Sequence, residues 1–374
     1  MGDEHPLVDL ILHRIRATGP LTVAEYMETA LYHREYGYYA AAARRSGREG
    51  DFYTSVDAGP VFGEMIAVQL AEICSLLQER GAVRIDLVDA GAGDGRLTRD
   101  ILTAAARNHP EFYDRVAVTL VERSHAAREC HARTLRAHTA KLSASSDRLP
   151  SSVTGVIVAN ELLDALPVHV VSASSSGLCE LYVAESDGAL IEVEGPLSTA
   201  VAEYTRGEPI GLDAGVRAEI GLQAIDWISE AAAALETGIL LLFDYGLPQS
   251  ELYSRARPRG TLTTYRRHTT TPDDYLKNPG AVDITAHVNL TAVTRAAEAA
   301  GLTSLGITDQ TYFLLALGIA EHLSAENDAQ AVSERLAAKT LLVPGGLGST
   351  IKVLAFSKAL GHPMLRGFAS ARLT

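Results

Sequence analysis

Cysteine is scarce in this sequence, and acidic residues outnumber basic ones. The 374 residues include three cysteines, Cys74, Cys130 and Cys179, which are far apart and form no CxxC pair. Neither a disulfide framework nor a zinc ribbon is therefore indicated, and the pattern fits a reducing compartment. The net charge of −13 weighs against a nucleic-acid partner, because phosphate binding requires a basic surface. An acidic surface would instead attract cationic ligands or basic peptide segments.

Signals for export, membrane attachment and metal binding are also lacking. The first residues are acidic and the apolar run behind them is brief, so no signal peptide is predicted. Pro6 stands where a myristoylation pattern requires Ser or Thr. No apolar stretch approaches the roughly 18 residues of a membrane span, and no His, Cys and carboxylate cluster has metal-ligand spacing. We expect a cytoplasmic protein with no metal and no membrane partner.

Strand-like and helix-like segments alternate from about residue 83 onward. The predicted strands are 83–91, 116–123, 152–160, 238–246 and 351–358, and predicted helices at 96–108 and 125–138 separate the first three. This alternation predicts an α/β fold, with a parallel sheet covered by helices on both faces. Because 47% of the residues are hydrophobic, the chain can bury a large core.

The best division of the chain is one catalytic α/β domain with additions. Residues 1–80 are predicted to be a helical extension, in which Thr22 caps a helix, followed by a Gly-rich loop. Residues 81–374 are predicted to be the Rossmann-like domain, with insertions at about 172–236 and 247–290. The second insertion is far longer than an ordinary loop, so it is either functional or partly structured.

A glycine-rich turn follows the first predicted strand. In "LVDAGAGDGRLT", Asp89 closes the strand and Gly91, Gly93 and Gly95 precede a predicted helix. Glycines at such a turn let the backbone approach a ligand closely. The dinucleotide fingerprint would require glycine in place of Arg96. The spacing GxGxG instead resembles motif I of class I S-adenosylmethionine-dependent methyltransferases.

Glu122 ends the next predicted strand. A carboxylate at this place can accept hydrogen bonds from both hydroxyls of an adenosine ribose, although a solvated strand-end charge is the alternative. With Asp89 and the glycine turn, Glu122 predicts a nucleoside cofactor, which the resemblance to motif I implies is S-adenosyl-L-methionine.

Several other stretches occur in the order typical of the MidA family, and the sequence is similar to that family over about residues 8–358. They are "LYHREYGYYA" (31–40), "GDFYTS" with "FGE" (50–55, 62–64), "ANELLDALPVH" (159–169), "FDYG" (243–246) and "DITAHVN" (283–289). The resemblance implies a Rossmann-like class I methyltransferase fold. The family's mitochondrial member is an arginine methyltransferase that assists assembly of respiratory complex I. The sequence departs from the family pattern in its glycine turn and at Val56-Asp57, where Pro-Glu is usual.

The stretch "ANELLD" contains the candidate catalytic residues Asn160, Glu161 and Asp164. The resemblance places them beside the transferred methyl group and implies that Asn160 also contacts the cofactor. Carboxylates are natural partners for the flat, five-donor cation of an arginine acceptor. If a helical turn begins after Asn160, the two carboxylates share one face. The alternative is that Asn160 caps a helix and Asp164 complements its dipole.

The remaining candidates lie in loops and at a later strand end. Asp51 and Thr54 are expected at the cofactor and Phe52 at the substrate, on a loop that could close as a lid. Tyr32 and Tyr38 could form an aromatic wall for a cationic substrate, although packing of the extension onto the core is the alternative. Asp244 and Tyr245 are expected to contact the substrate. His287 could act as a general base, although a bystander histidine is the alternative.

Three functions are consistent with these residues. The favoured one is methylation of an arginine in a protein or peptide. The second is methylation of a small molecule or a peptide natural product, which the change at Val56-Asp57 motivates. The third is a non-catalytic assembly protein that binds the cofactor. A homodimer is left open by the sequence.

Overall fold

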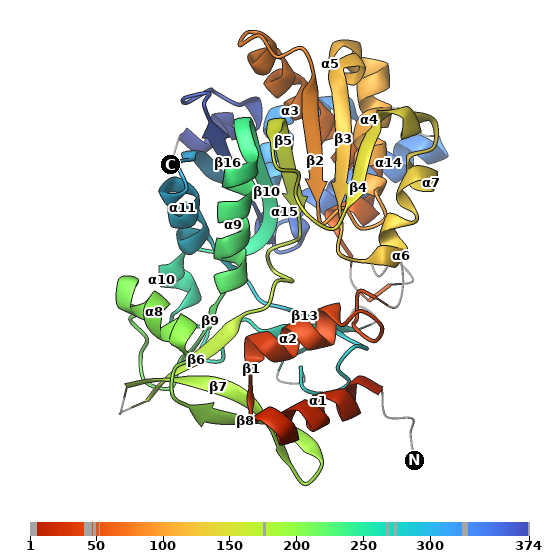
Figure 1. Ribbon diagram of the computed structural model, residues 1–374. Coiled ribbons are helices and arrows are strands. Elements are labelled where there is room, and N and C mark those ends of the chain that lie inside the picture. Colours follow the sequence, from red (N-terminus) through yellow and green to blue (C-terminus); the bar gives the residue numbers. More distant parts are fainter. Residues whose placement is uncertain are drawn as a thin grey trace.

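The predicted α/β domain is built on an eight-stranded sheet, which occupies the upper part of Figure 1. The computed structural model describes residues 6–40, 47, 50–51, 53–174, 177–266, 269–272, 275–323 and 328–372. The strand order is β15-β16-β10-β5-β2-β3-β4, and β14 pairs with β10. The strands are β2 (Ile85–Ala90), β3 (Val116–Val121), β4 (Leu142–Ser146), β5 (Val153–Asn160), β10 (Leu235–Leu247), β14 (Val288–Asn289), β15 (Thr303–Asp309) and β16 (Ile351–Lys358).

Parallel pairing joins β4, β3, β2, β5 and β10, whereas β16 is antiparallel to both β10 and β15. From β2 the chain proceeds to β3 and β4 on one side, and it then crosses to β5 on the other side. The order therefore reverses between β2 and β5. In open α/β sheets, ligands bind outside the carboxyl ends of the strands at such a reversal.

Helices cover both faces of this sheet. The core on one face includes residues of α3 (Pro60–Gln78), α4 (Arg96–Asn108), α5 (Pro110–Arg115), α12 (Gln310–Leu317) and α14 (Ala329–Leu342). The core on the other face includes residues of α9 (Leu222–Ala234) and α11 (Leu290–Ala299). Alternate strand residues face the two cores, as Leu87 and Val88 do, so the central strands are apolar on both sides.

Helix α3 is long and apolar enough to cross a membrane, although the sequence was expected to contain no stretch of that kind. In its 18-residue window, 61% of the residues are buried inside the protein. Phe62 and Ile66, both fully buried, belong to the core beneath the sheet. A core helix meets the same criteria of length and composition, and the burial of α3 fits that role.

A second sheet joins the N-terminal extension to the first insertion, at the lower end of Figure 1. Its order is β1-β7-β6-β9, with β8 paired to β7. The extension contributes α1 (Pro6–Thr18), β1 (Leu21–Thr22) and α2 (Val23–Tyr32), and the insertion contributes β6 (His169–Ser174), β7 (Gly177–Ser186), β8 (Ala189–Gly195) and β9 (Arg217–Ile220). Tyr26 and Met27 of α2 share a core with Leu181 and Val183 of β7. The extension and the first insertion, which are distant in the sequence, therefore share a sheet and a core.

Several predicted elements agree with the structure and others do not. The helix 96–108 and the strand 351–358 have the predicted bounds, and Thr22 caps α2 by accepting from the Glu25 backbone N–H at 3.1 Å. The helix expected at 125–138 is instead divided into three short helical segments. The elements not yet named are α6 (His125–Arg128), α7 (His131–Leu135), η2 (Arg136–Lys141), η1 (Ser55–Ala58), α8 (Thr199–Gly207), α10 (Gln249–Leu252), β11 (Thr263–Arg266), β12 (Thr269–Pro272), β13 (Asp283–Thr285), α13 (Ile319–His322), α15 (Leu347–Thr350) and η3 (Arg366–Arg372).

Candidate active site

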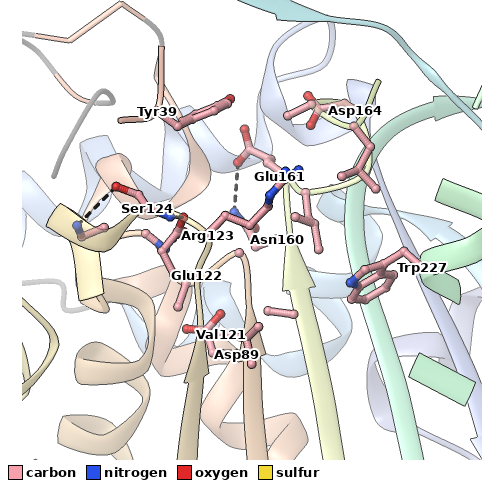
Figure 2. A pocket seen from close by; sticks show the side chains of 18 of the residues that line it. Tyr39, Asp89, Val121, Glu122, Arg123, Ser124, Asn160, Glu161, Asp164 and Trp227 are labelled. Carbon is pink, nitrogen blue, oxygen red and sulfur yellow. Dashed lines mark hydrogen bonds between the residues drawn. The ribbon is translucent and has the colours of Figure 1, made fainter. Parts of the chain in front are cut away.

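A cavity of about 1140 Å³ lies at the carboxyl ends of β2, β3, β5 and β10. Figure 2 shows Tyr39, Glu161 and Asp164 near one end of it and Asp89, Val121 and Trp227 towards the other. The first group is called the acceptor end and the second the cofactor end. The cavity occupies the place that the reversal in strand order predicts for a ligand.

The glycine turn lies at the cofactor end. Gly91, Gly93 and Gly95 have φ angles of +73°, +54° and +88°, which L residues with a side chain rarely adopt. A Cβ atom on Gly91 would lie 3.1 Å from Leu162, whereas one on Gly93 would meet no atom within 4 Å. Gly91 is therefore also needed for close packing, and Gly93 borders open space through which a ligand can approach.

Glu122 follows β3 and faces the same space (Figure 2). One carboxylate oxygen accepts from the Gly93 backbone N–H at 2.9 Å and the other from the Ser124 backbone N–H at 2.8 Å. Burial raises the pKa of Glu122, and these backbone donors oppose that shift. Each oxygen retains a lone pair, so the fixed carboxylate can still accept hydrogen bonds from two ribose hydroxyls.

Asp89 closes β2 beneath the turn and is 3% exposed. Its carboxylate accepts from the Thr98 hydroxyl of α4 at 2.6 Å, and burial raises its pKa to about 7. Asp89 therefore both lines the cavity and joins the end of β2 to the helix that follows the glycine turn.

Several cavity residues were missed from the sequence. Ser124, the loop 147–151 after β4, and Trp227 of α9 all line the cofactor end. Leu149 and Trp227 are partly buried apolar side chains that pack against the core on the α9 face. Residues 147–152, all described, contain no helix, so this part of the sheet face is left open to the cavity. In the sequence, residues 147–151 look like an ordinary loop, and Trp227 lies in what looks like an ordinary amphipathic helix. No local pattern therefore marks them as cavity residues.

The acceptor end is formed by a turn and not by the helix that we expected after Asn160. Residues 161–166 contain no helix, and Glu161 has a φ of +51° with its N–H donated to the Phe243 carbonyl at 2.7 Å. Asn160 therefore caps no helix, and Glu161 and Asp164 share no helical face. The turn is stabilised by Asp244, a residue distant in the sequence.

Asp244 was expected to contact the substrate, but it is 1% exposed and lies beneath the turn. Its carboxylate accepts from the backbone N–H groups of Leu162 at 3.2 Å, Leu163 at 2.7 Å and Asp164 at 3.3 Å, and also from that of Tyr245 at 2.9 Å. The three N–H groups of the turn thereby have an acceptor, although no helix forms there. Asp244 is therefore an anchor for the turn, and the substrate role expected for it is wrong.

Glu161 and Asp164 both line the cavity from this turn. A Glu161 oxygen accepts from the Ser55 backbone N–H and from the Asn160 amide, each at 3.2 Å. Burial and the nearby carboxylate of Asp164 raise the pKa of Glu161 to about 8. Burial and the nearby carboxylates of Asp244 and Asp283 raise the pKa of Asp164 well above its usual range. Within the described part of the chain, neither carboxylate forms a salt bridge with Lys or Arg. The amide oxygen of Asn160 is buried, and no described residue donates a hydrogen bond to it.

The loop before α3 joins the two ends of the cavity. Thr54 lines the cavity, and its hydroxyl donates to Asp57 at 2.9 Å. Asp57 also forms a largely buried salt bridge of 2.8 Å with Arg96, which follows the glycine turn. Asp57, at the departure from the family pattern, therefore contributes a structural ion pair beside the cofactor end.

Asp51 and Phe52, in the same loop, were expected at the cofactor and the substrate. Asp51 does not line the cavity, and its carboxylate accepts from the Tyr38 hydroxyl at 2.9 Å. Tyr38 is fully buried in the core of the extension. The packing alternative for Tyr38 is therefore correct, and the cofactor role expected for Asp51 is wrong because its side chain faces the extension. Phe52 lies outside the described residues.

Aromatic rings line the acceptor end. Tyr32 donates its hydroxyl to the Ala165 carbonyl at 3.0 Å, and the Arg123 guanidinium lies 4.0 Å from the centre of the Tyr32 ring. Tyr245 stacks on His287 with ring centres 6.4 Å apart, and both line the cavity. The His287 Nδ1 atom is buried and has no hydrogen-bond partner among the residues that the structure describes, and burial lowers the pKa of this histidine. His287 is therefore neutral and able to accept a proton.

The fold and the cavity together define an enzyme that binds a nucleoside cofactor beside an acceptor site. The left-handed glycines, the ribose-facing Glu122 and the apolar wall at Trp227 fit S-adenosyl-L-methionine. A family model for S-adenosyl-L-methionine-dependent methyltransferases matches residues 65–308, and the chain belongs to that family. The protein is an S-adenosyl-L-methionine-dependent methyltransferase, and its cofactor, when bound, supplies an electrophilic methyl group on a sulfonium.

Known relatives and solved structures agree with this class. The chain is 32% identical to a Burkholderia thailandensis protein whose crystal structure contains S-adenosyl-homocysteine, with a TM-score of 0.89 over 98% of this chain and 95% of that one. It is 28% identical to the mitochondrial protein arginine methyltransferase NDUFAF7 homolog of Caenorhabditis elegans, over 85% of this chain and 77% of the relative. It is 27% identical to human mitochondrial protein arginine methyltransferase NDUFAF7, over 84% of this chain and 74% of the relative.

Replacing Glu122 by Ala is expected to weaken binding of S-adenosyl-homocysteine by about thirtyfold, because charge-assisted hydrogen bonds to the ribose are lost. The Gly93 backbone N–H also loses its acceptor. Isothermal titration calorimetry measures the change, with Glu129→Ala, an exposed glutamate at the end of α6, as the control. An unchanged Kd for Glu122→Ala would assign Glu122 to the solvated strand-end alternative.

Proposed function

We propose that this methyltransferase methylates arginine side chains of a protein. The observation that carries the proposal is the pair of carboxylates at the acceptor end, half-buried Glu161 and buried Asp164, which line the cavity without a basic partner among the described residues. Burial and mutual repulsion disfavour their ionised forms. A cation that enters the cavity removes that penalty, so the site favours a cationic acceptor over a neutral one.

Guanidinium suits this site better than a generic cation. It is planar and presents five N–H donors, which carboxylates accept in a fork arrangement. Tyr39, Tyr245 and Tyr265 line the same end of the cavity, and aromatic rings favour a flat cation against their faces. The names of the relatives, protein arginine methyltransferase in worm and human, support the same acceptor.

The chemistry required of the residues is orientation followed by removal of a proton. Glu161 binds the N–H groups so that the remaining nitrogen is aligned with the methyl group, and most of the rate enhancement comes from that alignment. The new nitrogen–carbon bond forms as the carbon–sulfur bond breaks, and one N–H proton then leaves the methylated nitrogen. Glu161, whose pKa is raised to about 8, and His287, whose pKa burial lowers, are the groups at the acceptor end that we assign to remove this proton.

Transfer of labelled methyl groups tests the proposal. The purified protein is incubated with radiolabelled S-adenosylmethionine and cell extract, and the protein and small-molecule fractions are then counted separately. We expect label in protein and, after hydrolysis, in methylarginine. Label confined to small molecules would favour the second function open from the sequence and would overturn the arginine proposal. Binding of the cofactor without any transfer would favour the assembly role.

The rate with the arginine acceptor is expected to depend on pH. Burial raises the pKa of Glu161 to about 8, so the carboxylate that binds the guanidinium is mostly protonated at lower pH. The value of kcat/KM for the acceptor should therefore rise about tenfold per pH unit below pH 8 and level off above it. Initial rates at fixed cofactor concentration measure the profile. A profile that falls between pH 6 and 8 would contradict a role for ionised Glu161.

A further inference from the structure

His131 lies under the glycine turn, outside the cavity, and is 1% exposed. We infer that His131 is a positioning residue for cofactor binding: its imidazole fixes the peptide of Gly93, which in turn fixes the carboxylate of Glu122. The residue was not among those expected from the sequence, and it cannot contact the cofactor itself. Its effect on binding must therefore pass through the turn.

Both ring nitrogens of His131 have partners. Nε2 lies 2.8 Å from the Gly93 carbonyl oxygen, and Nδ1 lies 2.9 Å from the Ser145 hydroxyl of β4. A carbonyl oxygen can only accept, so Nε2 must bear the proton and Nδ1 must accept from Ser145 in the neutral ring. Burial lowers the pKa of His131, which favours this neutral form. A single tautomer is therefore selected by the two partners.

Gly93 connects the histidine to the cofactor site. Its carbonyl accepts from His131, and its N–H donates to a Glu122 oxygen at 2.9 Å. The other Glu122 oxygen accepts from Ser124. Gly93 has a φ of +54° and no side chain, so these hydrogen bonds help to hold the orientation of the two peptide planes that meet at its Cα. Loss of the bond from His131 would free the Gly93–Asp94 peptide and, through the Cα of Gly93, loosen the neighbouring Ala92–Gly93 peptide whose N–H orients Glu122.

The packing under the turn fits the same role. A Cβ atom on Gly95 would lie 3.6 Å from Cδ2 of His131 and 3.2 Å from Leu120, so the imidazole already fills the space below the turn. His131 begins α7, and Ser145 lies on β4, which pairs with β3 just before Glu122. The ring is therefore fixed by two elements that are independent of the cofactor.

The test compares two amides at this position. In His131→Gln the side-chain nitrogen can reach the place of Nε2 and donate to Gly93, whereas in His131→Asn it reaches only the place of Nδ1. We expect the asparagine variant to bind S-adenosyl-homocysteine about tenfold more weakly than the wild type, which is the loss expected for one buried hydrogen bond. The glutamine variant should remain within about threefold of the wild type. At saturating cofactor, both variants should retain the wild-type kcat and the wild-type KM for the acceptor.

A double-mutant cycle with Glu122→Ala tests the route of the effect. If His131 acts through Glu122, His131→Asn adds little to Glu122→Ala, because the orientation of an absent carboxylate no longer matters. Independent effects would multiply to roughly three hundredfold. Such multiplication, or equal affinities for the asparagine and glutamine variants, would overturn the inference. If His131→Asn does not fold, Ser145→Ala serves as the second variant, because it removes the donor that selects the tautomer of His131. Ser145→Ala should weaken binding of S-adenosyl-homocysteine by about threefold. Unchanged binding in Ser145→Ala would also overturn the inference.

Discussion

Replacing Glu161 by Gln lowers kcat by about a hundredfold or more and leaves the Kd for S-adenosyl-homocysteine within about twofold of the wild type. The substitution preserves the shape of the side chain and removes the charge that orients the acceptor. The Glu161 carboxylate lies at the acceptor end, and its contacts are to Ser55 and Asn160, whereas the ribose-facing carboxylate is Glu122. The variant should therefore lose turnover and keep its affinity for the cofactor product.

Single-turnover methylation and calorimetry measure the two quantities for Glu161→Gln. Glu230→Gln is a matched control, because Glu230 also lines the cavity but lies on α9, towards the cofactor end. It should retain wild-type turnover. If Glu161→Gln turned over at the wild-type rate, Glu161 would be a structural residue of the turn. Equal losses of turnover and cofactor affinity would show that the substitution disturbs the whole cavity.

Replacing Asp244 by Ala is expected to lower the free energy of unfolding by about 3 kcal/mol and to lower kcat by at least about tenfold. The substitution leaves the backbone N–H groups of Leu162, Leu163, Asp164 and Tyr245 without their acceptor. Because the side chain is 1% exposed, water cannot readily replace it. The turn that positions Glu161 should relax, although Asp244 itself does not line the cavity.

Urea unfolding measures the stability of Asp244→Ala, and the same preparation gives its turnover. Asp244→Asn retains one acceptor oxygen and should lose less of both quantities. Asp226→Ala, an exposed aspartate on α9, should leave the free energy of unfolding unchanged. An Asp244→Ala protein as stable as the wild type would contradict the anchoring role. One that is destabilised but fully active would show that the turn need not be fixed for catalysis.

The parallel core could be predicted because its signal is local. Each central strand is a short apolar run, and each following helix has apolar residues at helical spacing, so the alternation is visible in the sequence. The helix 96–108 and the strand 351–358 were predicted with the observed bounds. The ends of the strands then indicated Asp89, Glu122 and Glu161, because ligands bind at that edge of a parallel sheet.

The hairpin of β7 and β8 has a local pattern in the sequence, but the joining of the N-terminal extension to the second sheet could not be predicted from local pattern. Its strand β1 is only two residues long and pairs with β7, more than 150 positions later in the chain. The turn after Asn160 is a similar case. A helix is a reasonable expectation for "ELLDAL", but Asp244, contributed by a neighbouring strand, satisfies the backbone donors of a turn instead. Both features depend on contacts between distant segments.

The cofactor end shows the same limit. Glu122 could be predicted because a strand-end carboxylate has a known use, whereas Trp227 approaches the cavity only after α9 has packed on the sheet. His131 lies in a segment that was predicted to be one continuous helix, and the break between α6 and α7 allows its ring to reach Gly93. Its partners are 38 and 14 positions away in the chain.

A crystal structure of the enzyme with S-adenosyl-homocysteine and an arginine-bearing acceptor peptide tests the central claim most directly. The peptide would be taken from the protein that becomes labelled in the methyl-transfer experiment. We predict that its guanidinium lies between Glu161 and Asp164, with N–H groups within hydrogen-bond distance of both carboxylates and one nitrogen facing the sulfur. An acceptor group that occupies another part of the cavity and contacts neither carboxylate would contradict the account.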